Sequence, residues 1–269
     1  MKKFDERYVG KDKLVGRRMR LNKFTLEVNE KGYAPLVFFG DVHWGSPQCD
    51  TDAVKDMLDW SLKNNVALIL MGDLLEASLR DSVGYGVYQQ KLQPQEQMEE
   101  MIELLQPLAD KGLIKTLLTG NHEERITKNT GIDISKLMAR ILKVPYGGYA
   151  CWNLVRVGKQ NYTIYTTHGS GGSTLPHTKL NSVVKMGYFL QADCVAMGHL
   201  HGLSTDIRLI EYVDLKDKMV KQHKQYVVLT GAYLKWAGGY AEVKGMPISK
   251  IGSPKAKLRA DYHDIHFTL

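Results

Sequence analysis

Short apolar runs rich in β-branched and aromatic residues, each bounded by turn-forming residues, recur along the chain and predict β-strands. These predicted strands cover residues 36–40, 66–72, 114–120, 151–157, 162–167, 193–198, 207–213, 226–231 and 262–269. Between them, apolar positions recur at a spacing of about 3.6 residues, which is typical of amphipathic helices. The helices predicted in this way cover residues 51–63, 95–110, 132–142 and 178–190.

The order of these elements is β-α-β-α-β, followed by mostly strands with one helix. This order favours an α/β fold in which a partly parallel sheet faces a second, more antiparallel one. We expect one domain over residues 32–269, preceded by a basic N-terminal extension over residues 1–31 that packs on or near it. Residues 77–93 follow a strand end without regular periodicity, which is typical of an active-site loop.

Composition narrows the class of protein. The chain is 43% hydrophobic and 24% charged, as soluble globular proteins are. The apolar run at residues 66–71 is too short to cross a bilayer, and the basic N-terminus has no apolar stretch behind it that would indicate a secretory signal. Three widely spaced cysteines predict neither a disulfide framework nor a cysteine zinc site, and they favour a reducing cytoplasm.

The net charge of +7 is unevenly distributed. Residues 1–31 carry ten Lys and Arg against five Asp and Glu, and residues 214–260 carry ten against three, whereas residues 32–213 carry sixteen against nineteen. Such basic flanks are compatible with a polyanionic partner such as nucleic acid, and equally with an ordinary solvated surface.

Polar side chains follow five of the predicted strands at the point where each strand ends. They are Asp41 and His43, Asp73, Asn121 and His122, His168, and His199 and His201. A single Asp in such a place is typical of a helix cap, and a single His is typical of a structural polar group. Recurrence at five strand ends instead indicates one shared site, because parallel strands bring such ends to one edge of a sheet.

Carboxylate, imidazole and amide groups are ligands of borderline divalent cations, and the absence of thiolates excludes a cysteine-rich zinc or iron–sulfur site. Two aspartates, four histidines and one asparagine are too many for one ion. They suit two ions that share a carboxylate, spaced ~3.5–4 Å apart, with a bridging hydroxide that attacks a phosphoryl group. His122, next to Asn121, would then be free to act as a general acid.

The motifs D-x-H (Asp41, His43), G-D (Asp73), G-N-H-E (residues 120–123), an isolated His (His168) and G-H-x-H (residues 198–201) occur in this order. In this respect the chain resembles the calcineurin-like metallophosphoesterase superfamily. The resemblance implies a four-layer α/β/β/α sandwich of two mixed β-sheets flanked by helices. It also implies a dinuclear centre, with Mn²⁺ the expected metal and Fe, Zn²⁺ or Ni²⁺ as alternatives.

The same resemblance implies a role for each residue. The first metal would be bound by Asp41, His43 and His201, and the second by Asn121, His168 and His199. Asp73 would bridge the two metals, and His122 would protonate the leaving oxygen.

Departures from the phosphoprotein phosphatases bear on the substrate. Glu76 stands where those enzymes have the aspartate that orients the catalytic histidine, and it is the candidate for the same role here. Ala77 replaces their phosphate-binding arginine. Arg80 or Arg125 are candidates for that missing function. The spacing otherwise resembles the nuclease branch of Mre11 and SbcD, although Glu123 stands where an aspartate is usual there.

The Gly- and Ser-rich segment 167–177 is either a loop that contacts substrate phosphate or a flexible connector. His177 at its end is a candidate for stacking on a base, and packing is the alternative. The chain lacks the G-x-S-x-G, P-loop and H-E-x-x-H motifs, which argues against a serine hydrolase, a P-loop NTPase and a zincin.

Three functions remain open from the sequence. The favoured hypothesis is a two-metal phosphodiesterase, most readily a nuclease acting on DNA or RNA. The alternatives are a phosphomonoesterase acting on a phosphoprotein or small ester, and a non-catalytic scaffold, which the complete ligand set disfavours. Oligomeric state is not predicted.

Overall fold

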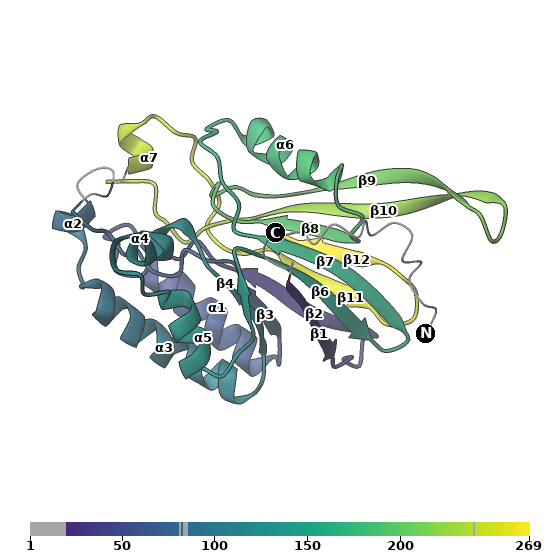
Figure 1. Cartoon of the computed structure of the whole chain (residues 1–269), viewed down its shortest axis with the longest axis horizontal. Helices are drawn as coiled ribbons and strands as arrows, with labels where there is room; N and C mark the ends of the chain where they lie inside the picture. Colours follow the sequence, from purple (N-terminus) through teal and green to yellow (C-terminus); the bar gives the residue numbers. More distant parts are fainter. Residues whose placement is uncertain (1–19, 81, 83–85, 239) are drawn as a thin grey trace.

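The computed structural model describes residues 20–80, 82, 86–238 and 240–269. Two six-stranded mixed sheets lie face to face, with helices on their outer sides (Figure 1). The predicted four-layer α/β/β/α sandwich is therefore confirmed. No helix among the described residues is both long and apolar enough to cross a membrane.

The first sheet contains four parallel strands and an antiparallel C-terminal pair. Its strands, in spatial order, are β12 (Ile265–Thr268), β11 (Lys255–Arg259), β2 (Tyr33–Phe39), β3 (Ala67–Leu70), β4 (Ile114–Leu118) and β5 (Tyr146–Gly148). The outer face is covered by α1 (Thr51–Lys63), α3 (Pro94–Asp110), α4 (Asn121–Thr130) and α5 (Ile134–Ile141).

The second sheet packs against the inner face of the first. Its strands are β1 (Arg20–Leu26), β6 (Ala150–Val157), β7 (Gln160–Thr167), β8 (Cys194–Met197), β10 (Met219–Thr230) and β9 (Leu203–Asp214). Helix α6 (Pro176–Gly187) packs on its outer face, and α2 (Gly86–Gln89) and α7 (Tyr240–Val243) are single turns.

Alternation along the strands explains the layers. On β2, Leu36 and Phe38 point into the core between the two sheets, whereas Val37 and Phe39 point into the core under the helices. All four side chains are fully buried, so the strand is a continuous apolar run rather than an alternating one. Because β2 packs in both cores, it fixes the position of the first sheet relative to the second sheet and to the helices.

The structure departs from the expected elements in a few places. Each sheet has three parallel and two antiparallel pairings, so the second sheet is not the more antiparallel of the two. Residues 20–26 of the expected extension form the edge strand β1, whereas residues 1–19 lie outside the described residues. Strands β5 and β11 and helix α4 were not expected, because they are short or predominantly polar.

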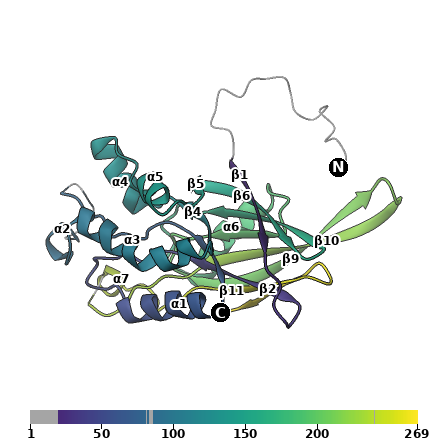
Figure 2. The ribbon, with the colours of Figure 1, turned by 90° about the horizontal axis from the view of Figure 1, so that it is seen from below.

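The β9–β10 hairpin extends well beyond the rest of the second sheet (Figures 1 and 2). Its residues Ile207, Leu209, Val213 and Val220 share one face by register, and all are more than half exposed. They continue the face that packs between the sheets nearer the centre of the molecule, where Tyr226 and Val228 are buried.

His263, in the C-terminal segment, contacts the second sheet through Tyr162 and Asp193. His263 stacks on the Tyr162 ring with ring centroids 4.5 Å apart, and its Nε2 donates to Asp193 Oδ1 at 2.9 Å. This bond to the carboxylate raises the pKa of His263. Burial raises the pKa of Asp193, but bonds from His263 and Thr163 outweigh it and lower the pKa.

The raised pKa of His263 predicts a pH-dependent stability. A histidine with a raised pKa stabilises the fold fully below its unfolded pKa of ~6.5, and the stabilisation is lost as pH rises through the folded pKa. Replacing His263 by Gln should therefore lower the melting temperature more at pH 5.5 than at pH 8.5. The effect should stay under about 1 kcal/mol because the His263 side chain is 45% exposed and solvent screens the pair.

His266→Gln is the matched control, because His266 is exposed on the next strand. Thermal unfolding of the three proteins at both pH values makes the comparison. A His263→Gln defect of the same size at pH 5.5 and pH 8.5 would contradict the assignment.

Candidate metal centre

All seven residues expected to bind metal meet where strand ends of the two sheets come together. Asp41 and His43 follow β2, Asp73 follows β3, and Asn121 begins α4 directly after β4. The second sheet contributes His168 after β7, and His199 and His201 after β8. The site therefore depends on both sheets, and neither sheet alone contains it.

The loops after these strands are held by backbone hydrogen bonds to one another. The main-chain oxygen of Asp73 accepts bonds from the backbone N–H groups of Val42 and His43, at 2.8 and 3.0 Å. Both carboxylate oxygens of Asp41 accept a bond from the His199 N–H at 3.0 Å. These bonds join the ends of β2, β3 and β8 directly.

Five of the seven residues have left-handed backbone conformations. The φ angles are 49° for Asp41, 53° for His43, 47° for Asp73, 66° for His199 and 51° for His201. Each such residue costs about 1–3 kcal/mol, and such strain concentrates at functional sites. These turns therefore have unfavourable backbone conformations that direct the five side chains toward a common point.

The glycines of the motifs permit this close approach. A Cβ on Gly120 would lie 2.1 Å from both the backbone nitrogen and Oδ1 of Asp73. A Cβ on Gly198 would lie 2.8 Å from Asp41 Oδ2. Any larger residue at Gly120 would push β4 away from Asp73.

The donor atoms form two adjoining groups. In one, His43 Nε2 lies 3.2 Å from His201 Nε2, and His201 Nε2 lies 3.4 Å from Asp41 Oδ1. Two nitrogens that bind one ion at ~2.0–2.1 Å each in tetrahedral geometry are roughly 3.3 Å apart, so this spacing fits a shared cation.

In the second group, Asn121 Oδ1 lies 2.9 Å from His168 Nε2 and 2.6 Å from His199 Nδ1. Asp73 Oδ2 lies between the groups, 3.3 Å from His168 Nε2 and 3.8 Å from His43 Nε2. This is the position that a carboxylate shared by two ions would need.

Hydrogen bonds outside the cluster fix which nitrogen of each imidazole faces it. Main-chain carbonyls accept from His168 Nδ1 (Met71, 2.9 Å) and from His199 Nε2 (Gly171, 2.9 Å). The Glu76 carboxylate lies 3.2 Å from His43 Nδ1. His168 and His43 therefore present Nε2 to the cluster, and His199 presents Nδ1, as metal-binding histidines do.

The cluster attracts positive charge. Burial lowers the pKa of His168, but the Asp73 carboxylate outweighs it and raises that pKa to about 10. A carboxylate that attracts a proton here also attracts a metal ion in its place. All three cysteines are buried elsewhere, so the donors are oxygen and nitrogen alone.

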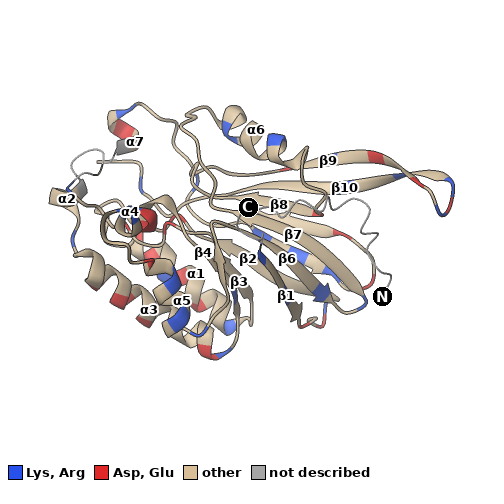
Figure 3. Ribbon diagram, viewed as in Figure 1, with Lys and Arg blue, Asp and Glu red and all other residues tan. Residues whose placement is uncertain are grey.

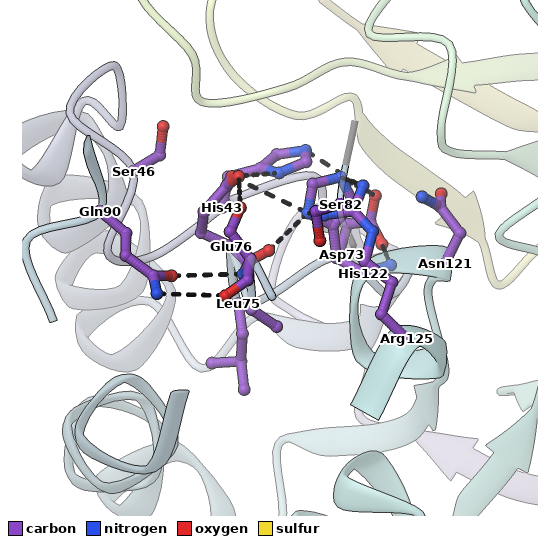
Figure 4. A network of polar contacts seen from close by, with 12 residues as sticks. His43, Ser46, Asp73, Leu75, Glu76, Ser82, Gln90, Asn121, His122 and Arg125 are labelled. Atoms are coloured by element: carbon purple, nitrogen blue, oxygen red, sulfur yellow. Dashed lines mark hydrogen bonds and ion pairs between the residues drawn. The ribbon is translucent and has the colours of Figure 1, made fainter. Parts of the chain in front are cut away.

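His122 lies beside the cluster in a fixed orientation (Figure 4). Its Nδ1 donates to the main-chain oxygen of Glu76 at 2.6 Å, while Arg125 donates to its Nε2 at 3.0 Å. Burial lowers the pKa of His122 to about 4, opposed by Asp73 and assisted by His43 and Arg125. The ring edge with Nε2 faces Asp73 Oδ2 at 3.9 Å.

Glu76, the candidate for orienting the catalytic histidine, contacts both His43 and His122. Its carboxylate is closer to His43 Nδ1 than to His122 Nδ1, which is 3.8 Å away, and it also accepts a bond from Ser78 Oγ at 2.8 Å. Burial raises the pKa of Glu76, but His43 outweighs it and lowers the pKa to about 2. The backbone carbonyl of Glu76 orients His122, and its charged side chain orients His43.

The expected substrate-binding residues have different surroundings. Arg125 is half-buried against His122. Arg80 and His177 are exposed, and within the described part of the chain neither side chain forms a hydrogen bond or ion pair. The loop around residue 77 is fastened by the buried Gln97, which accepts from the Ala77 N–H at 2.8 Å.

Comparison with known proteins agrees with this geometry. The family model described as calcineurin-like phosphoesterase matches residues 34–203, which contain all the motifs. The chain belongs to the calcineurin-like phosphoesterase family. No curated protein matches it, and the Mre11- and SbcD-like branch stays a prediction.

The chain also matches solved structures that are distant in sequence. The phosphoesterase Yfce from E. coli is 17% identical with a TM-score of 0.42, over 87% of this chain and 98% of that one. A metallophosphoesterase from Sphaerobacter thermophilus is 14% identical with a TM-score of 0.39, over 87% and 86%. Vps29 from Entamoeba histolytica, complexed with Zn²⁺, is 14% identical with a TM-score of 0.36, over 87% and 97%.

Glu123 is a residue of this calcineurin-like site whose importance the sequence did not reveal. Its buried carboxylate accepts backbone N–H bonds from Asp73 (3.1 Å), Leu75 (3.0 Å) and Gly120 (2.9 Å). It thereby links the loops after β3 and β4. Its position as the third residue of α4 could have indicated this role, because a Glu there is typical of a helix capping box.

We predict that Glu123→Gln destabilises the protein by about 1–3 kcal/mol, because an amide NH₂ would face a buried N–H donor. It should also weaken Mn²⁺ binding, because Asp73 loses its support. Urea unfolding and metal analysis after gel filtration measure the two effects. The exposed Glu103→Gln on α3 is the control, and equal stability of the two variants would contradict this role.

Proposed function

We propose that this protein hydrolyses phosphodiester bonds, with DNA or RNA as its substrate and two divalent metal ions as cofactors. The observation that carries the proposal is the convergence of seven oxygen and nitrogen donors around Asp73, with His122 beside them. Such a cluster does not stabilise the fold, since it adds strained turns and buried charge, and it therefore indicates a function.

In this proposal Asp41, His43 and His201 hold the first ion, and Asn121, His168 and His199 hold the second. Asp73 is shared between them. When bound, the pair of ions would neutralise the phosphoryl oxygens and supply activated water for in-line attack. The donor set suits Mn²⁺, with Fe, Zn²⁺ or Ni²⁺ also compatible, because it contains no thiolate.

His122 supplies the proton for the leaving oxygen. Because Nδ1–H is fixed by the Glu76 carbonyl, the group that exchanges protons with substrate is Nε2. Arg125 donates to that nitrogen and is in reach of any anion beside it. A phosphate that accepts the Arg125 bonds would leave Nε2 free, and its negative charge would favour uptake of a proton from solvent at Nε2, which the imidazolium then transfers to the leaving ester oxygen.

The site suits a diester more than a monoester. The position of the phosphatase arginine is occupied by Ala77, which is fully buried. Among the described residues, no Lys or Arg other than Arg125 bonds to His122 or the seven donors. One guanidinium matches the single negative charge of a diester better than the double charge of a monoester.

The substrate class is tested by turnover with Mn²⁺ of bis-p-nitrophenyl phosphate, p-nitrophenyl phosphate and a single-stranded oligonucleotide, repeated with Zn²⁺ and Ni²⁺. We expect the two diesters to be hydrolysed and the monoester to be a poor substrate. Cleavage of the monoester alone would overturn the proposal in favour of a phosphomonoesterase.

The roles within the site are separated by two variants. His122→Ala should retain two metal ions per chain and lose turnover by a factor of about 10²–10⁴, the usual scale for loss of a general acid. Asp73→Ala should lose both ions, because it removes the carboxylate shared by both groups. Metal content and turnover are measured together, and full activity of His122→Ala would remove it from this role.

A further inference from the structure

A cavity of about 490 Å³ opens beside the second group of donors. Asn121 and His168 form part of its lining, so the cavity and the cluster share two side chains. Its volume lies in the range of ~300–1,000 Å³ that is usual for pockets binding small ligands. A group bound at the cluster therefore has room to extend into this cavity.

The walls of the cavity differ in chemistry. On the α4 side, Glu124 accepts a bond from the Tyr149 hydroxyl at 3.1 Å and pairs with Lys128 at 3.3 Å. On the α6 side are Ser182, Lys185 and Met186. Helix α6 has two lysines and no acidic residue, and it carries only basic segments in Figure 3.

We propose that this cavity binds the nucleoside attached to the scissile phosphate, with the next phosphate of the strand held by Lys185. This inference rests on the proposed phosphodiesterase function. It adds a subsite that selects nucleotide chains over simple esters.

Each part of a nucleotide has a matching surface. Met186 and Met197 offer apolar, adaptable side chains to a base. The hydroxyl of Ser182 and the carboxylate of Glu124 are partners for sugar hydroxyls or base amino groups. The exposed ammonium of Lys185 is the one Lys or Arg group in this lining, and in this proposal it is the partner of the next phosphate.

A small aryl diester lacks the second phosphate, so the two kinds of substrate should respond differently to Lys185. Lys185→Ala should raise the ratio of KM for a thymidine trinucleotide to KM for bis-p-nitrophenyl phosphate by about three- to tenfold, the usual effect of one lost charged contact. It should also reduce the slope of log KM for the trinucleotide against log salt by about 1. Lys185→Arg, which keeps the positive charge, should leave the KM ratio and the salt slope as they are in the unchanged protein.

Lys55→Ala, an exposed lysine on α1, is the matched control and should leave the ratio unchanged. Binding of a fluorescent trinucleotide, followed by anisotropy with Mn²⁺ in the His122→Ala background, supplies a readout that needs no turnover. Weaker binding with Lys185→Ala but not with Lys55→Ala supports the subsite.

The outcomes separate this inference from the function beneath it. Equal binding and equal KM ratios for the Lys185 and Lys55 variants, in a protein that hydrolyses bis-p-nitrophenyl phosphate, overturn the subsite and leave the phosphodiesterase standing. A Lys185-dependent loss of binding in a protein that cleaves no diester supports the subsite and overturns the phosphodiesterase.

Discussion

The fold is organised around one buried carboxylate. Asp73 is 1% exposed, and its Oδ2 lies within 4 Å of nitrogens from His43, His122 and His168. Burial raises its pKa, but these histidines, His168 first, hold the pKa well below its usual range. An isolated charge at this depth would be strongly unfavourable, so the carboxylate persists only among groups that neutralise it. The loops that carry these histidines must therefore keep them close to Asp73. The Glu123 carboxylate accepts a hydrogen bond from the Asp73 N–H and holds its backbone in place.

Placement of the donors follows from the sandwich. The inter-sheet core, with Phe38 and Tyr162 fully buried, keeps the strand ends of one sheet at a constant distance from those of the other. The turns beyond those ends adopt left-handed backbone at Asp41 and Asp73, a cost that the packed scaffold absorbs. A rigid frame with strained tips is well suited to holding metal ligands before any ion arrives, because little reorganisation is then needed.

We attribute the proposed preference for diesters to charge at the edge of the centre rather than to the centre itself. The seven donors match the motifs by which the chain resembles the calcineurin-like family, and the charged groups around His122 lie beside them. Glu76 directs its carboxylate at His43 and its carbonyl at His122, and Arg125 approaches from α4 instead of from the loop after β3 (Figure 4). In the proposed function, Arg125 is the guanidinium nearest the reacting phosphate, and Lys185 in the cavity lining is a second cation that an extended substrate would reach.

Periodicity and motif spacing predicted most of the buried strands, the four main helices, the layered fold and the seven polar residues that meet at the strand ends. They did so because continuous apolar runs such as residues 66–72 have few alternative structures and because Asp, Asn and His rarely recur together at five strand ends. Tertiary structure decided the rest. Edge strand β1 and helix α4 are stabilised by neighbours more than by their own pattern, since their exposed faces are polar. The roles of Glu123 and of the Glu76 carbonyl depend on backbone groups brought together from separate loops, and a one-dimensional pattern contains no such distances.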